Sequence, residues 1–205
     1  MARLTTSDNI TLSYLIEDSP SRSTVIFLHG WCANALEWLP FADALKHQHR
    51  VICWNARGHG RQNTSNDACM SLERMADDLE ELLIQQAPSN AILVGHSMGA
   101  LVSWRYIQKY GCKRLSGLCI FDQSPRLVTD EHWQMGVYGD FDQQRNADFI
   151  QRLRDNFSDT VIRLICSRLD QTQQPLPQNS FTERLRDYLD ALPAELLTRC
   201  WQSLS

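Results

Sequence analysis

Short apolar runs alternate with amphipathic segments along the first part of this chain. The runs are rich in β-branched, aliphatic and aromatic residues, and each gives way to glycine, asparagine or aspartate, which favours short buried strands. Of the amphipathic segments, 71–87 is the clearest, with leucines and a methionine at helical spacing and acidic residues on the other side. The pattern predicts strands and helices in alternation: strands at 24–28, 50–54, 91–94 and 115–121, and helices at 35–46, 71–87 and 98–110.

Strands that are apolar on both faces and alternate with helices indicate a mostly parallel central sheet with helices on both faces. A two-stranded hairpin at residues 2–16 is predicted to precede it. After Pro125 the pattern becomes helical and polar without further strand signals, with a break at 174–177. We therefore expect an α/β core of residues 1–127 and a helical lid of residues 128–205.

Composition and charge exclude several classes of protein. The 205 residues carry 20 Lys and Arg against 24 Asp and Glu, with no basic tract, so we expect no nucleic-acid partner. Apolar runs of about four residues are far shorter than the roughly 20 of a membrane span, and no secretory signal is visible, so we expect no membrane association. The seven cysteines include no CxxC pair, which disfavours a disulfide framework or metal site and favours a reducing, cytoplasmic location.

The pentapeptide GHSMG at residues 95–99 lies between a predicted strand and a predicted helix. The pattern G-x-S-x-G in that context is typical of a nucleophile elbow, in which Ser97 adopts a strained turn and its hydroxyl stands clear of the sheet. Gly95 and Gly99 flank the serine because side chains at these positions would collide. The alternative interpretation is an ordinary Gly-Ser turn.

A second sequence, His29-Gly30-Trp31, follows the first core strand. A glycine there lets the backbone come close to a substrate oxygen. We expect the backbone N–H groups of Trp31 and Met98 to form an oxyanion hole. His29 is expected to orient its own loop through a side-chain hydrogen bond rather than act as a general base. His96 is expected to point its side chain elsewhere on the turn.

These motifs resemble the α/β-hydrolase superfamily. The runs that carry the resemblance lie within residues 1–127, in the family's order and roughly at its spacing: VIFLHGW at 25–31, NALEW at 34–38, ARGHG at 56–60 and LVGHSMGA at 93–100. NALEW and QQAP at 85–88 are also locally similar to small carboxylesterases that cleave a pimeloyl methyl ester. The resemblance implies a serine hydrolase for a small-molecule acyl ester that needs no metal or other cofactor. Asn55 departs from the family's usual aspartate, and Arg57 to His59 are expected to belong to a structural loop.

The sequence after Ser97 lacks the usual arrangement of a catalytic acid followed by a catalytic histidine. In the superfamily the serine is followed by an acid and then by a histidine near the C-terminus, yet no histidine lies beyond His132. We expect the last core strands to be missing, and little or no turnover by the chain as it stands. Asp122, at the end of the strand 115–121, is a candidate acid, although an aspartate there more often caps a turn, and His132 is the remaining candidate base.

Two other interpretations stay open. One is a truncated pseudoenzyme that binds an acyl ligand or a partner, with its lid as the contact surface. The other is the peroxidase-like activity of some cofactor-free family members, which uses the same serine. If the sheet ends at 115–121, its open edge favours self-association.

Overall fold

The computed structural model of the chain describes residues 1–20, 23–60, 62, 64–87, 89–166, 176 and 178–205. Pro88 and the expected break at 174–177, apart from Leu176, lie outside the described residues.

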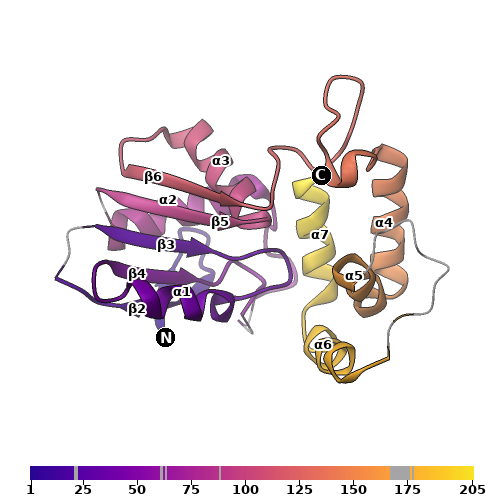
Figure 1. Ribbon diagram of the computed structural model, residues 1–205, viewed down its shortest axis with the longest axis horizontal. Helices are drawn as coiled ribbons and strands as arrows, with labels where there is room; N and C mark the ends of the chain where they lie inside the picture. The colour runs from indigo at the N-terminus through magenta and orange to yellow at the C-terminus, as the bar shows by residue number, and fades with distance from the viewer. Residues whose placement is uncertain (21–22, 61, 63, 88, 167–175, 177) are drawn as a thin grey trace.

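A six-stranded sheet forms the core, in the order β1-β2-β4-β3-β5-β6 (Figure 1). The pairs β4–β3, β3–β5 and β5–β6 are parallel, whereas β1–β2 and β2–β4 are antiparallel. The expected hairpin and the mostly parallel sheet are therefore confirmed. The strands have these bounds: β1 Ala2–Thr5, β2 Thr11–Glu17, β3 Thr24–Leu28, β4 Arg50–Trp54, β5 Ala91–His96 and β6 Leu115–Phe121.

Nine helical segments of the described residues connect and cover the strands. The single helix expected at 35–46 is instead a 3₁₀ turn followed by an α-helix. The Asn34 side chain accepts a hydrogen bond from the Leu36 N–H and starts the 3₁₀ turn, while Pro40 lies in the first turn of the α-helix, where its missing N–H costs nothing. The segments are η1 Ala35–Trp38, α1 Leu39–Leu45, α2 Leu72–Gln86, α3 Met98–Tyr110, η2 Val137–Gly139, α4 Gln143–Asp155, α5 Phe157–Cys166, α6 Ser180–Asp190 and α7 Ala194–Leu204.

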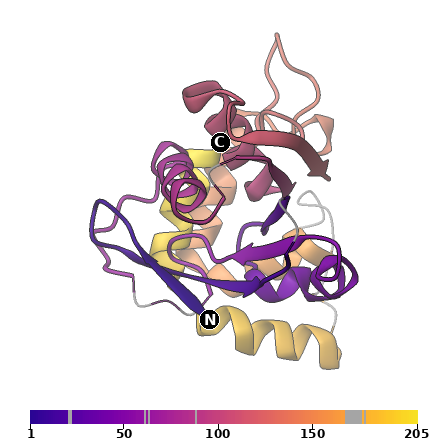
Figure 2. The same ribbon diagram turned by 90° about the vertical axis from the view of Figure 1, so that its left-hand side faces the viewer.

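Helices cover both faces of the sheet, with α1 on one side and the pair α2 and α3 on the other (Figure 2). The fully buried strand β3 contributes to both sides because its side chains alternate between faces. Val25 and Phe27 pack with Trp38 on the α1 side, whereas Ile26 and Leu28 join the larger cluster beneath α2 and α3. None of the described helices is long and apolar enough to cross a bilayer.

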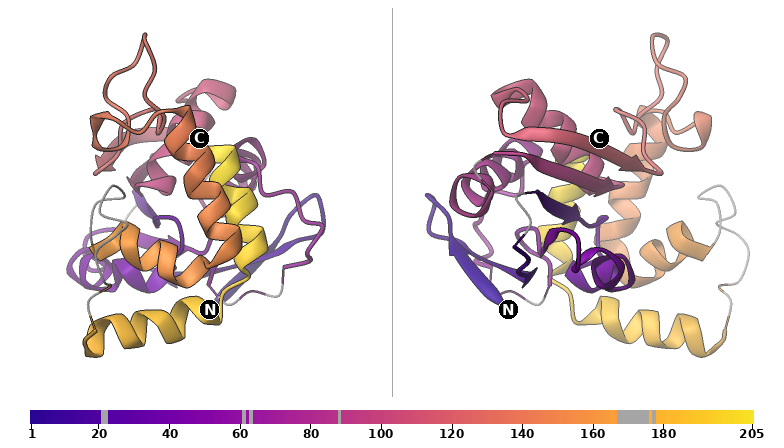
Figure 3. Two further views of the ribbon diagram at one scale, coloured as in Figure 1. Left: turned by 90° about the vertical axis from the view of Figure 1, so that its right-hand side faces the viewer. Right: turned by 60° about the vertical axis from the view of Figure 1, so that its left-hand side comes forward.

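The helices α4 to α7 lie beside the carboxyl ends of the parallel strands, and α4 and α7 run side by side (Figures 1 and 3). Trp31, on the loop after β3, anchors this group of helices to the core. Its ring packs edge-on against Trp201 of α7, with ring centroids 4.9 Å apart, and its indole N–H donates to the Leu197 carbonyl at 2.9 Å. One apolar cluster therefore runs from the sheet into these helices.

A buried ion pair fixes the loop after β4. The Arg57 guanidinium is fully buried and donates to both carboxylate oxygens of Asp78, at 2.6 and 2.7 Å, and to Asp8 at 2.9 Å. The hydrogen bonds from Arg57 hold the pKa of Asp8 well below its usual range. Paired planar groups of this kind are rigid, which agrees with the structural loop expected at Arg57 to His59.

Strand β6 lies at an edge of the sheet, and within the described residues it pairs only with β5. Its apolar side chains are correspondingly exposed, 38% for Leu118 and 43% for Phe121. Backbone N–H and C=O groups on the outer side of such a strand can pair with another chain.

We expect the 205-residue chain to self-associate through the β6 edge. Leu118→Lys should shift the chain toward monomer, because a charge on an edge strand opposes pairing between chains. Leu36→Lys is the matched control, since Leu36 is 58% exposed but lies on η1 rather than on the edge. Sedimentation velocity over a range of concentrations measures the effect, and a wild type that stays monomeric throughout contradicts the prediction.

Candidate active site

Ser97 forms the turn between β5 and α3. Its backbone angles, φ 47° and ψ −114°, lie in a region that residues other than glycine rarely occupy. The Ser97 N–H donates to the Phe121 carbonyl at 3.2 Å, which ties the turn to the end of β6. The strained turn expected from the GHSMG sequence is therefore present, and Ser97 lines a cavity beneath the helices α5 to α7.

The two flanking glycines are required by close backbone contacts. A Cβ atom on Gly95 would lie 2.7 Å from the Ala100 nitrogen, and a Cβ atom on Gly99 would lie 2.2 Å from the Leu28 carbonyl oxygen. Helix α3 thus begins directly against the end of β3. This contact sets the serine turn beside the loop that follows β3.

That loop holds the Gly30–Trp31 peptide in one orientation. The Gly30 carbonyl accepts hydrogen bonds from His29 Nδ1 at 2.7 Å and from the Ala33 N–H at 3.1 Å. The described chain has no cis peptide, so the Trp31 N–H points opposite to the Gly30 carbonyl. Within the described residues neither this N–H nor that of Met98 donates a hydrogen bond, and both residues line the cavity.

Two buried histidines behind the loop act as fixed neutral groups. His29 Nε2 accepts from the Ala56 N–H at 3.0 Å, and His59 Nε2 accepts from the Cys32 N–H at 3.2 Å, so in each ring Nδ1 carries the proton and donates to a carbonyl. Burial lowers the pKa of His29 to about 3 and that of His59 to about 4. The loop-orienting hydrogen bond expected for His29 is therefore observed.

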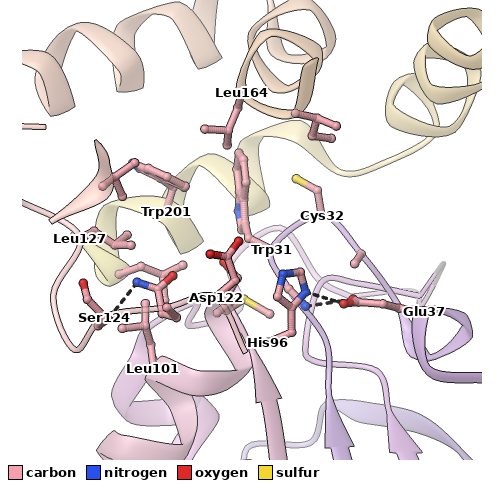
Figure 4. Close-up of a pocket in the computed structure, with 18 of the residues that line it drawn as sticks. Trp31, Cys32, Glu37, His96, Leu101, Asp122, Ser124, Leu127, Leu164 and Trp201 are labelled. Carbon is pink, nitrogen blue, oxygen red and sulfur yellow. Dashed lines mark hydrogen bonds and ion pairs between the residues drawn. The ribbon is translucent and has the colours of Figure 1, made fainter. Parts of the chain in front are cut away.

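Glu37 belongs to the NALEW run at 34–38, which predicts no role for it, yet it lies in the cavity. One of its carboxylate oxygens accepts from His96 Nδ1 and the other from the Gly30 N–H at 3.2 Å (Figure 4). The hydrogen bond to Glu37 raises the pKa of His96 above its usual value, against the effect of burial. His96, expected to point elsewhere on the turn, lines the same cavity as Ser97. Because 59 residues separate the two partners, no local pattern could have paired them.

The two candidates for acid and base occupy different places. Asp122 follows β6 with a φ of 47°, lines the cavity and helps to raise the pKa of His96. The His132 side chain is 83% exposed and lies 3.2 Å from Glu131, outside the residues that line the cavity. The structure therefore does not bring His132 to Ser97. Among the described residues no histidine hydrogen-bonds the Ser97 hydroxyl.

The cavity has a volume of about 880 Å³. Its ionisable side chains, Glu37, His96 and Asp122, lie near the carboxyl ends of the strands, while the walls are mainly apolar. In the part of the chain that the structure describes, no three His, Cys, Asp or Glu side chains gather as a metal site. The apolar wall residues come from the core and from the helices above it: Trp31, Leu101, Leu127, Met135, Val137, Leu164, Ile165, Leu185, Leu189, Trp201 and Leu204.

The sequence matches the α/β hydrolase fold family over residues 23–185. The chain belongs to this family. This α/β hydrolase is 34% identical over 136 residues to a pimeloyl-acyl-carrier-protein methyl ester esterase of Yersinia enterocolitica, covering 65% of the chain and 50% of that protein. It is 31% identical over 125 residues to a non-heme chloroperoxidase of Kitasatospora aureofaciens, covering 60% of the chain and 44% of that protein.

The fold is similar to that of an esterase from Exiguobacterium antarcticum, with a TM-score of 0.80 and 17% identity over 98% of this chain and 72% of that one. The chain spans about half the length of the methyl ester esterases that it matches.

We expect Gly99→Ala to destabilise the protein by about 1–3 kcal/mol or more, because the added methyl group overlaps the Leu28 carbonyl and α3 must shift. Gly117→Ala is the matched control, since a Cβ atom there meets only side-chain carbons of Ile92 at 3.5 Å or more. Denaturant unfolding of both variants measures the difference. Equal stabilities would show that the contact at Gly99 is not required.

We expect the free energy of unfolding to fall as the pH drops from about 6.5 to about 4. His29 and His59 stay neutral when folded but take up protons when unfolded, so the unfolded state binds up to two more protons. The slope should approach about 2.7 kcal/mol per pH unit, or about 1.4 for each proton. Denaturant unfolding at several pH values tests this. A flat profile between pH 6 and 5 contradicts it.

Proposed function

We propose that this α/β hydrolase cleaves carboxylic esters of acyl compounds with Ser97 as the nucleophile. The observation that carries the proposal is the strained turn of Ser97 at the N-terminus of α3, where the residue lines a large cavity. A turn of this kind costs free energy and is retained where it presents a side chain for chemistry.

In the proposed reaction Ser97 Oγ attacks the ester carbonyl carbon. An Oγ–C bond forms, the C–O bond to the alcohol breaks, and the alcohol leaves with a proton. Water then attacks the acyl-enzyme and releases the acid together with free Ser97. The backbone N–H groups of Trp31 and Met98 are the proposed donors to the oxyanion, because both lie at the cavity and neither donates elsewhere within the described residues.

The walls of the cavity support an acyl ester as the substrate. They are lined mainly by leucine, isoleucine, methionine and tryptophan side chains, which favour an aliphatic acyl group over a polar one. The methyl ester esterases among the relatives support the same class of substrate.

Ligand binding without turnover is the second candidate function. One observation favours it: among the described residues no histidine hydrogen-bonds Ser97 Oγ, and a serine hydroxyl without a base is a weak nucleophile. In this case the same cavity would hold an acyl ligand.

A fluorophosphonate probe and p-nitrophenyl esters test the proposal. We expect the probe to modify Ser97 and to leave Ser97→Ala unmodified, as read by intact mass and peptide mapping. Turnover of p-nitrophenyl acetate by residues 1–205 should be slow, because no histidine of the described residues hydrogen-bonds Ser97 Oγ, and removing the general base from such a site costs about 10⁴–10⁶ in kcat.

Esters of longer acyl chains should react faster than the acetate because the cavity wall is apolar. A folded wild type that the probe never modifies at Ser97 contradicts the hydrolase proposal and favours ligand binding.

A further inference from the structure

A single carboxylate joins the two segments that carry the proposed oxyanion donors. Glu37 accepts from the Gly30 N–H, on the loop after β3, and from His96 Nδ1, on the serine turn. Glu37 itself lies on neither segment, because it belongs to η1. It therefore bridges the loop and the turn from outside both.

The two segments also approach each other closely at this point. A Cβ atom on Gly30 would lie 3.1 Å from His96 Nδ1 and 3.5 Å from the Ser97 Cβ. The Gly30–Trp31 peptide is already held on its carbonyl side by His29. The hydrogen bond from the Gly30 N–H to Glu37 holds the preceding peptide as well, so the backbone on both sides of Gly30 is fixed.

Charge strengthens this bridge. His96 carries a raised pKa, with Glu37 bonded to it and Asp122 adding a further attraction, while His29 nearby is neutral. The side chains of Glu37 and His96 are 26% and 35% exposed, so water screens the pair only in part. Hydrogen bonds between ionised partners are stronger than those between neutral ones.

We propose that Glu37 is a positioning residue for the hydrolase reaction: it holds the loop of Trp31 and the turn of Ser97 and Met98 in one fixed relation. The inference rests on the proposed function, in which the N–H groups of Trp31 and Met98 bind the oxyanion. Glu37 touches no reacting atom in this role. Its removal lets the loop drift relative to the turn, and misplacement by about 1 Å can cost about 100-fold in rate.

Three variants separate the bridge from general effects. Glu37→Ala removes both hydrogen bonds. Glu37→Gln keeps them in uncharged form, because the amide oxygen can accept from the Gly30 N–H while the amide nitrogen donates to a neutral His96 Nδ1. Glu131→Ala is the control, since the Glu131 side chain is 84% exposed and lies outside the cavity.

The first measurement is the rate at which a fluorophosphonate modifies Ser97. In this step an Oγ–P bond forms, the P–F bond breaks, and fluoride and the hydroxyl proton leave to the solvent. We expect Glu37→Ala to lower the maximal rate about 10- to 100-fold, with the half-saturating probe concentration changed less than about twofold. Glu37→Gln should restore most of the rate at a pH where His96 is neutral, and Glu131→Ala should equal the wild type. Equal maximal rates for wild type and Glu37→Ala overturn the proposal.

The second measurement does not depend on the reactivity of Ser97. Amide hydrogen exchange followed by NMR should show the Gly30 N–H exchanging at least about tenfold faster in Glu37→Ala, with the amide of Ile52 in the sheet unchanged. In the wild type the Trp31 amide resonance should shift as His96 titrates, and this shift should vanish in Glu37→Ala. Unchanged Gly30 exchange overturns the positioning role, whereas an unmodified but folded wild type overturns the hydrolase proposal instead.

Should Glu37→Ala not fold, Glu37→Asp takes its place in both measurements. Aspartate keeps the charge but is one methylene shorter, so it cannot reach both Gly30 and His96. Glu37→Asp must lower the rate of Ser97 modification and speed exchange of the Gly30 N–H as Glu37→Ala does. A Glu37→Asp variant that matches the wild type in both overturns the proposal.

Discussion

Helix α3 can begin directly against the end of β3 because residue 99 has no side chain. The backbone at Gly99 lies so close to the Leu28 carbonyl that even a methyl group does not fit, and the end of β3 is thereby pressed against the start of the helix. Leu28 and Gly95 are also paired neighbours in the sheet. Since parallel strands end at the same edge, the loop after β3 and the turn after β5 emerge side by side, and every feature of the candidate site is built on that juxtaposition.

Three histidines around this edge have pKa values shifted in opposite directions because their surroundings differ. His29 and His59 are fully buried, each with one nitrogen donating to a carbonyl and the other accepting from a backbone N–H, and an imidazolium could not satisfy that pattern. His96 is half-buried and faces two carboxylates, which favour its protonated form. The fold therefore places an ionisable ring, His96, between two carboxylates, whereas the two histidines that support the neighbouring loops stay neutral.

The sheet and the serine turn could be predicted because their signals are local. Strand runs, the G-x-S-x-G spacing and the helix after it are each encoded within about ten residues. The position of His29 directly after β3 was enough to predict its hydrogen bond to its own loop. The Glu37–His96 pair could not be predicted, since 59 residues separate the partners and only the packing of η1 against the turn brings them together.

The split of residues 35–46 into a 3₁₀ turn and an α-helix was also missed. There the Asn34 cap and Pro40 override the apolar spacing that predicts one continuous helix.

Trp31 belongs to two parts of the molecule at once. Its backbone N–H is a proposed oxyanion donor, while its ring packs against Trp201 and its indole N–H donates to the Leu197 carbonyl in α7. A substitution in the helices that line the cavity can therefore also shift the backbone of Trp31. Under the proposed function, a change in these helices that displaces the Trp31 ring also displaces the proposed donor. Residues of α7 that contact this ring therefore affect both the shape of the cavity and the position of the proposed donor.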